Sequence, residues 1–347
     1  MVARAGGSHR WLAETWPPFL AKEEVLLRGM RNAASTQRTY HVGYNSYCRT
    51  MNYVFPGVAF LPATDEKIAA WFTFLRDSCT ASTIRNYFYG VGSAHGDELL
   101  PFPALKDCKQ ACQVLRGIRR ARQDTIKRAQ ALGVEELLRM ANAVDRRATE
   151  GLLSARDIAN DKAVWAAALF AFVGMLRKSA VCGPQGLRRQ DVRFEQRGGE
   201  VVAWVTLTGG KTMQFGDRTH GFPVPSVESK LCAVTAMLDH MAAAPAEGED
   251  AMFQWCPPQG GTTPMSHACF VTRLRVLLEA AGLKPDDFTG HSLRRGGATL
   301  AFEHNVDVRR IMQHGDWKSS VVFQYHQVSD ATRLLLPQRM VAAMARA

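Results

Sequence analysis

The sequence has no apolar run long enough to cross a lipid bilayer. Its most apolar stretch, Ala163 to Leu176, is too short, because a spanning helix needs about 20 apolar residues. The N-terminus shows no secretory signal peptide. We therefore expect a soluble intracellular protein without a membrane partner.

Metal-ligand spacing is also missing. The eight cysteines include no Cys-x-x-Cys pair and no histidines at a matching distance. Cys108 and Cys112 are four apart, but the helical pattern around them favours small core residues. The carboxylates do not cluster as a two-metal nuclease requires. We expect reduced thiols, no metal and no cofactor.

Acidic residues are outnumbered by basic ones. The chain has 43 Lys and Arg against 32 Asp and Glu, which gives a net charge of +11 and a pI near 9.5. Such a charge favours an anionic partner, and nucleic acid is the commonest one. The composition, 46% hydrophobic and 22% charged, is globular, and 347 residues are enough for two domains.

Tyrosine is almost absent from the second half of the chain. Tyr325 is the only tyrosine after Tyr89, and it ends the run HSLRRGGATL…IMQHGDWKSSVVFQY. His291 and Arg294, three apart in a helical pattern, share one face and can reach one phosphate together. The phenol of Tyr325 is a nucleophile that can attack phosphorus. This stretch is the candidate centre of the chemistry.

Two segments of this run carry a family resemblance. HSLRRGGAT and GDWKSSVVFQY resemble the C-terminal boxes of tyrosine recombinases, the phage-integrase family, which joins DNA through a phosphotyrosine intermediate. The wording of HSLRRGGAT and the spacing from Trp317 to Tyr325 resemble the branch carried by Crypton DNA transposons and DIRS-like retrotransposons. The resemblance covers roughly residues 30 to 335.

The resemblance implies six catalytic residues. The family's other positions are an Arg after a hydrophobic helix and a Lys in a β-hairpin, for which FVGMLRKS and TLTGGKTMQFG offer candidates. The set is Arg177, Lys211, His291, Arg294, Trp317 and Tyr325. The family usually has an acid three residues after the first Arg, where this chain has Ala180, so support for that guanidinium would come from elsewhere.

Each of the six has an expected role. The two arginines would neutralise charge on the nonbridging oxygens, and His291 would accept the tyrosine proton. Lys211 would protonate the departing 5′ oxygen, and Trp317 would donate its indole N–H to the phosphate and buttress Tyr325. His314 is a rival for the Trp317 position, and Arg295 points off the shared face.

The expected fold is mainly α. Residues 1–30 form an N-terminal arm, and residues 31–125 form a helical, SAM-like core-binding bundle. Its helices begin near Ser35 or Thr36, Thr64 or Asp65, and Ser82, and a fourth covers residues 108–122. Residues 126–347 form a mixed α/β catalytic domain with a small β-hairpin or sheet and a C-terminal tail. Together the two domains would form a clamp around DNA.

The catalytic domain has further expected elements. Helices cover Gly133–Val144, Ala155–Leu176 and Phe270–Ala281, and strands cover Val201–Thr208 and Gly221–Pro225. Gly296 and Gly297 are costly inside a helix, so close packing is the expected reason. Ser319 or Ser320 would cap a last helix that carries Tyr325.

Basic residues outside the catalytic set are candidates for DNA contact. Arg38 and Arg85 lie beside an aromatic stripe that itself favours bundle core, and a basic run begins in the last part of the fourth helix and continues beyond it. That run consists of Arg116, Arg119, Arg120, Arg122, Lys127 and Arg128. Its position between two domains favours phosphate contact over a merely solvated face, and as a nuclear localisation signal it is unspecific.

The function implied is a site-specific DNA recombinase or transposase that acts on double-stranded DNA through a 3′-phosphotyrosyl intermediate. Two alternatives stay open: a topoisomerase IB-like or resolving enzyme with the same chemistry, and a decayed DNA-binding protein. The family further implies self-assembly from dimer to tetramer on DNA, with the apolar and basic tail docking in cis or on a neighbour. In a eukaryotic host the protein would act in the nucleus, and otherwise in the cytoplasm or nucleoid.

Overall fold

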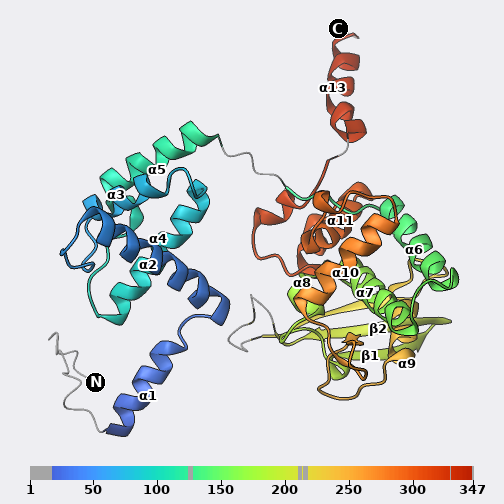
Figure 1. Cartoon of the computed structure of the whole chain (residues 1–347). Coiled ribbons are helices and arrows are strands. Elements are labelled where there is room, and N and C mark those ends of the chain that lie inside the picture. The colour runs from blue at the N-terminus through green and yellow to red at the C-terminus, as the bar shows by residue number, and fades with distance from the viewer. Residues whose placement is uncertain (1–17, 124–127, 210–212, 214–217, 329, 346–347) are drawn as a thin grey trace, which may run out of the picture. The chain divides into compact units, whose positions relative to one another are not determined.

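The computed structural model describes residues 18–123, 128–209, 213, 218–328 and 330–345. The chain folds into two compact units, Met1–Ile126 and Lys127–Ala347 (Figure 1). The sequence placed this boundary between residues 125 and 126. All eight cysteines are free thiols. None of the helices in the described ranges is both long and apolar enough to cross a membrane.

The first unit is helical throughout its described part. Its elements are α1 (Pro18–Gly29), α2 (Ala34–Val54), α3 (Asp65–Leu75), α4 (Ala81–Asp97), the 3₁₀ helix η2 (Leu105–Asp107) and α5 (Lys109–Arg122). Helix α2 packs along α4, and α3 packs along α5. Pro18–Gly29 of the expected arm form α1, while residues 1–17 lie outside the described residues.

Side-chain caps explain where two of these helices begin. The Thr64 hydroxyl accepts the Lys67 amide before α3, and the Thr80 hydroxyl accepts the Thr83 amide before α4. The expected cap of α2 at Ser35 or Thr36 is wrong, because the helix starts at Ala34 with no side-chain cap. Packing against α4, and not a side-chain cap, therefore stabilises the first turns of α2.

The α2–α4 contact depends on glycine. A Cβ at Gly43 would come within 2.7 Å of the Tyr87 carbonyl oxygen, and one at Gly90 within 2.3 Å of the Tyr40 carbonyl oxygen. At each glycine the missing side chain lets the backbone of the other helix approach closely. Tyr47 of α2, which belongs to the expected aromatic stripe of Tyr40, Tyr44 and Tyr47, is fully buried, with its ring edge-on to Trp71 at 5.3 Å between centroids.

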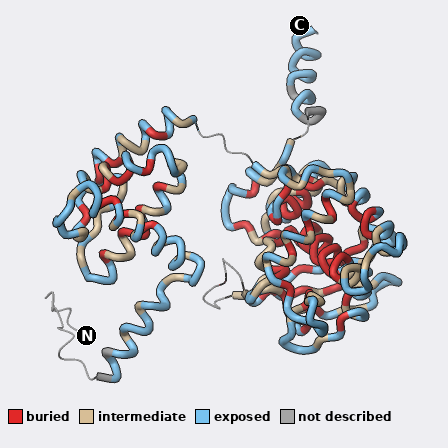
Figure 2. The backbone as a smooth tube through the Cα atoms, viewed as in Figure 1, coloured by how far each residue is buried: buried red, intermediate tan, exposed pale blue. Residues whose placement is uncertain are grey.

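The second unit is built around one buried helix. Its helices are α6 (Val134–Thr149), α7 (Ala155–Val173), α8 (Lys178–Val181), α9 (Ala233–Ala243), α10 (His267–Ala280), α11 (Gly290–Glu303), α12 (Val308–His314) and α13 (Asp330–Met344). Helix α7 packs against α6, α8, α9, α10 and α11, and it forms the buried centre of this unit in Figure 2. It ends at Val173, before the expected Leu176, because Gly174 caps it and Met175 takes a positive φ of 48°.

A three-stranded antiparallel sheet covers one side of this core. The strands are β1 (Val192–Arg197), β2 (Glu200–Leu207) and β3 (His220–Pro225), in the order β1-β2-β3. Ala203, Val205 and Leu207 of β2 are buried, and β2 and β3 both pack against α9. A second sheet pairs β4 (Gln254–Trp255) with β5 (Thr263–Pro264). The mainly helical fold with a small antiparallel sheet confirms the expected fold class.

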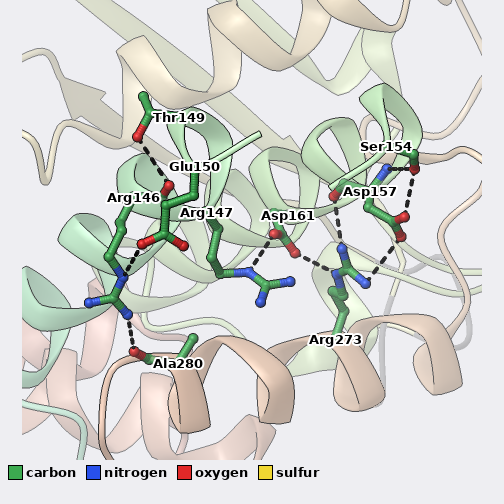
Figure 3. A network of polar contacts seen from close by, with 9 residues as sticks. All are labelled: Arg146, Arg147, Thr149, Glu150, Ser154, Asp157, Asp161, Arg273 and Ala280. Atoms are coloured by element: carbon green, nitrogen blue, oxygen red, sulfur yellow. Dashed lines mark hydrogen bonds and ion pairs between the residues drawn. The ribbon is translucent and has the colours of Figure 1, made fainter. Parts of the chain in front are cut away.

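Ion pairs tie α7 to its two neighbours. The Asp161 carboxylate is 2% exposed and accepts Nε of Arg147 on α6 at 2.9 Å and Nε of Arg273 on α10 at 2.5 Å (Figure 3). Arg273 also reaches Asp157, whose own carboxylate accepts the Ser154 hydroxyl. One buried carboxylate therefore joins three helices.

Two consecutive glycines let α11 approach the core closely. A Cβ at Gly296 would lie 1.9 Å from the Leu132 carbonyl oxygen, and one at Gly297 would lie 2.1 Å from the Phe172 carbonyl oxygen. Both obstacles are backbone atoms and cannot rotate away. This contact sets the position of α11 against α7 and is the close packing that the sequence predicted.

Candidate active site

Arg294 of α11 is the buried centre of the site. Its side chain is 2% exposed, and its Nη1 donates to the Met175 carbonyl and its Nη2 to the Gly315 carbonyl at 2.8 Å. Burial lowers the pKa of Arg294, and the charge of the nearby Arg177 lowers it further. Tyr325 and Asp316 raise this pKa and so offset part of the effect. A guanidinium held this way is costly unless a further anion binds.

Trp317 and Tyr325 both pack against this guanidinium. The Arg294 Cζ lies 3.8 Å from the Trp317 ring centroid and 5.4 Å from the Tyr325 ring centroid. The two rings meet edge to face with 5.2 Å between centroids. Cation–π contact thus holds the phenol beside the buried charge.

Tyr325 does not lie within an α-helix as expected. The preceding segment is a five-residue 3₁₀ helix, η5 (Ser320–Gln324), and Ser319 makes no side-chain cap bond. Tyr325 follows as its C-cap, its amide donates to the Val322 carbonyl at 2.9 Å, and its carbonyl accepts the Thr299 hydroxyl at 3.2 Å. The short turn is fixed to α11 through Thr299.

Arg177 lies at the N-cap of α8, directly after the turn that ends α7. It lines a narrow cleft of about 30 Å³ together with Arg294, Ala180, His220 and Asp316. Bidentate guanidinium geometry suits a phosphate, and two guanidinium groups meet here. Ala180 is 9% exposed and brings no carboxylate to Arg177.

His291 lies in the first turn of α11, three residues before Arg294. Burial of part of the imidazole lowers the pKa of His291, although the residue as a whole is exposed. Nearby positive charges lower this pKa further; they belong to Arg294, Lys178, Arg177 and Arg295. The neutral imidazole therefore persists below the ordinary histidine range, so its nitrogen can accept a proton near neutral pH.

Two donors in this site have no partner within the described part of the chain. The Arg294 Nε and the Trp317 Nε1 are both buried and unpaired there. Buried donors are nearly always satisfied in folded proteins, so an unpaired pair on adjoining side chains marks a place for an acceptor. Both donors belong to predicted catalytic residues.

The structure brings Arg177, His291, Arg294, Trp317 and Tyr325 to one place. Lys211 lies outside the described residues, so its role as general acid stays a prediction. His314 faces away: its Nε2 bonds the Val173 carbonyl at 2.9 Å and its ring packs on Phe222. Arg295 donates to the Ala129 carbonyl, in the segment that enters the unit.

Sequence reasoning missed Asp316, Arg218 and His220. Asp316 is the acidic side chain among the described residues of the cleft, and it pairs with Arg218 at 2.8 Å. His220 bonds the His314 carbonyl at 2.9 Å. The position of Asp316 directly before Trp317 was the one signal available.

The predicted DNA-contact residues mostly face solvent. Arg85, Arg116 and Arg119 line one hollow of about 670 Å³ between α4 and α5. The other exposed members are Arg38, Arg120 and Arg128. Arg122 is partly buried and donates to the Arg76 carbonyl at 2.7 Å, and Lys127 lies outside the described residues. Contact with DNA stays a prediction for all of them.

Sequence comparison places the chain in a family. A model described as the phage integrase family matches residues 134–332. The integrase/recombinase xerD homolog of Selenomonas ruminantium is 24% identical over 292 residues, which cover 83% of this chain and 79% of the relative. The chain belongs to the phage integrase family and is a tyrosine recombinase.

Solved structures share the fold. The lambda integrase(75-356) dimer bound to a COC' core site matches with a TM-score of 0.58 and 16% identity, over 89% of this chain and 94% of that chain. The Tn1549 transposon integrase in complex with transposon right end DNA matches with a TM-score of 0.57 and 12% identity, over 92% and 98%. The XerH recombinase bound to difH matches with 0.55 and 16%, over 88% and 78%.

Proposed function

We propose that this recombinase cleaves and rejoins DNA at specific sites and so integrates or excises a mobile element. The Tyr325 Oη attacks the scissile phosphorus, a Tyr–phosphate bond forms at the 3′ end, and the bond to the 5′ oxygen breaks. His291 takes the phenolic proton and Lys211 returns a proton to the 5′ oxygen. The phosphotyrosyl bond conserves the energy of the phosphodiester, so rejoining needs no cofactor.

The observation that carries this proposal is the pair of buried unpaired donors beside the phenol. A phosphate bound at this site would offer oxygen acceptors to the Arg294 Nε and the Trp317 Nε1, which have no partner in the described part of the chain. It would also offset the charge of Arg294 and that of the nearby Arg177, which lowers the pKa of Arg294. Preorganised donors of this kind supply much of the stabilisation of charge in a transition state.

Covalent trapping on nicked duplex DNA tests the proposal. The nick lies just beyond the scissile phosphate, so the short fragment that carries the newly freed 5′ hydroxyl diffuses away. Rejoining is then impossible, and a cleaving enzyme stays attached to the 3′ phosphate. We expect the unsubstituted protein to form an adduct and Tyr325→Phe to bind the same DNA without one. Tyr89→Phe is the matched control because its ring is partly exposed in the first unit. An adduct with Tyr325→Phe would contradict the assignment of the nucleophile.

The topoisomerase-like or resolving alternative uses the same chemistry without exchange between sites. Two copies of a candidate site on one plasmid distinguish the two functions, because only a strand-exchanging recombinase deletes or inverts the segment between them. Deletion or inversion supports the proposal, and relaxation of supercoils without rearrangement supports the alternative.

We further propose that the two units close around double-stranded DNA as a clamp and that the protein assembles on it as a dimer or tetramer. The solved structures of lambda integrase include a dimer on a core site and a tetramer on a Holliday junction. Helix α13 exposes Leu334, Leu335, Met340, Val341 and Met344, which suits docking of the tail on a neighbouring copy. Removal of residues 330–347 should leave DNA binding and reduce the tetramer in sedimentation on DNA.

The branch and the location are also proposals. The HSLRRGGAT wording and the Trp317–Tyr325 spacing support the Crypton or DIRS-like branch. A eukaryotic element of this kind would act in the nucleus, and the basic run from Arg116 to Arg128, which begins within α5, suits import. Terminal repeats or a reverse transcriptase beside the gene would support this branch, and a bacterial genomic context would exclude it.

A further inference from the structure

An ion pair that sequence reasoning missed lies at the edge of the cleft. Arg218 Nη1 donates to Asp316 Oδ1 at 2.9 Å, and Arg218 Nη2 donates to Asp316 Oδ2 at 2.8 Å. The side chains are 25% and 11% exposed. Two parallel bonds of this kind fix both the distance and the plane of the two groups. The residues are 98 apart in sequence, so the pair joins separate elements.

Asp316 belongs to the turn that orients Arg294. Its φ is +55°, a left-handed conformation that costs a non-glycine residue energy and needs support from its surroundings. The Gly315 carbonyl before it accepts Arg294 Nη2 at 2.8 Å, and the Trp317 ring after it lies over the same guanidinium. A shift of this turn would therefore move two of the contacts that hold Arg294.

The approach to β3 holds this turn at two points. Arg218 binds the Asp316 carboxylate, and two residues later His220 bonds the His314 carbonyl at 2.9 Å. The turn is thus fixed on its flank by the sheet and on its inner face by Arg294.

The pair also has an electrostatic consequence. A carboxylate in the cleft that receives a phosphate would repel that phosphate, and at low local dielectric the repulsion is large. The Arg218 fork occupies both Asp316 oxygens. It thereby compensates the carboxylate while leaving it to stabilise the charge of Arg294.

We propose that Arg218 and Asp316 are positioning residues of the recombination reaction. Their ion pair fixes the Gly315–Trp317 turn that aims Arg294 at the scissile phosphate, and it screens the Asp316 carboxylate from that phosphate. The inference rests on the proposed function, since it concerns the same phosphate.

This arrangement predicts a non-additive pattern of rates. Arg218→Gln leaves a largely buried carboxylate without its bidentate cation and should slow single-turnover cleavage about a hundredfold. Asp316→Asn removes the anion and the support together and should cost about tenfold. The double variant should match Asp316→Asn and cleave faster than Arg218→Gln alone. Arg218→Lys keeps the positive charge and should recover most of the rate.

A modified substrate separates positioning from folding. A methylphosphonate at the scissile position replaces one charged nonbridging oxygen with a methyl group, so the Asp316 carboxylate has less charge to repel. On this substrate the deficit of Arg218→Gln relative to the unsubstituted protein should shrink to about threefold or less. The ratio of the two rates within one variant does not depend on its folded fraction.

Arg188→Gln is the matched control. Arg188 forms an exposed pair with Glu249 at 2.9 Å and makes no hydrogen bond or ion pair with the predicted catalytic residues that the structure describes, so the rates of this variant should equal those of the unsubstituted protein. Additive losses, or a deficit of Arg218→Gln that is equal on both substrates, would overturn the inference and leave the proposed function standing. No cleavage by the unsubstituted protein would overturn the proposed function and the inference with it.

Discussion

Replacement of Asp161 by Asn removes one buried charge from the centre of the catalytic unit and changes little of its shape. The carboxylate is 2% exposed and joins Arg147 of α6 to Arg273 of α10 (Figure 3). The asparagine amide can accept one of these bonds but cannot balance two guanidinium groups. The helix that carries Asp161 is α7, which leads to Arg177.

The cost follows from the burial of the partners. Breaking a fully buried ion pair by removing one side costs about 3–5 kcal/mol. The arginine side chains are 20% and 16% exposed, and Arg273 keeps Asp157 at 3.4 Å, so solvent and that second acid reduce the loss. We expect Asp161→Asn to lower the free energy of unfolding by about 3 kcal/mol.

Urea unfolding followed by the signals of the second unit measures this loss. The control is Glu150→Gln, which breaks the pair of Arg146 and Glu150, whose side chains are 55% and 47% exposed in the same region. This exposed pair should change stability by less than about 1 kcal/mol. A loss for Asp161→Asn no greater than that of the control would refute the reasoning.

Three further predictions concern acid, packing and catalysis. Burial lowers the pKa of His240 to about 4, so as the pH falls below 6.5 the unfolded chain takes up a proton on this histidine before the folded chain does. The free energy of unfolding should therefore drop by roughly 2 kcal/mol between pH 7 and pH 5. Equal urea midpoints at the two pH values would contradict this. Gly296→Ala forces a Cβ against backbone atoms and should lower the free energy of unfolding by about 2–3 kcal/mol. Gly117→Ala is the control, because it has open space around it and should not destabilise the protein. Thermal melting curves of the two variants check this. The lowered pKa of His291 keeps its imidazole neutral, so the cleavage rate should fall with acid only below the ordinary value of 6.5, and an acid limb above that value would contradict its role as proton acceptor.

Local patterns allowed prediction of most elements of the fold. The apolar run through α7, the Thr64 cap and the Gly-Gly pair of α11 all act through near neighbours in sequence, and the expected helices formed there. Strand β1 was missed although Val192 and Phe194 alternate with Arg193 and Glu195, because the run is short and half of its residues are charged. The 3₁₀ segment before Tyr325 was expected to be α-helical, since a serine before an apolar run resembles a helix start.

The site shows a different limit. Arg294 and Trp317 stand in the two family boxes, HSLRRGGAT and GDWKSSVVFQY, so their association was predictable from the resemblance. The partners that hold this box lie far away in the chain: Arg218 pairs with Asp316 across 98 residues, and the Met175 carbonyl accepts Arg294 across 119 residues. Such contacts depend on how α7, α11 and the sheet pack, and nothing in the local pattern specifies them.

The most direct test of the central claim is the chemical identity of the bond between protein and DNA. After incubation with nicked duplex, the adduct is digested with protease and the peptide that carries the nucleotide is sequenced by mass spectrometry. The account predicts a nucleotide joined through its 3′ phosphate to the phenolic oxygen of Tyr325. Attachment to another side chain, or to a 5′ phosphate, would contradict it.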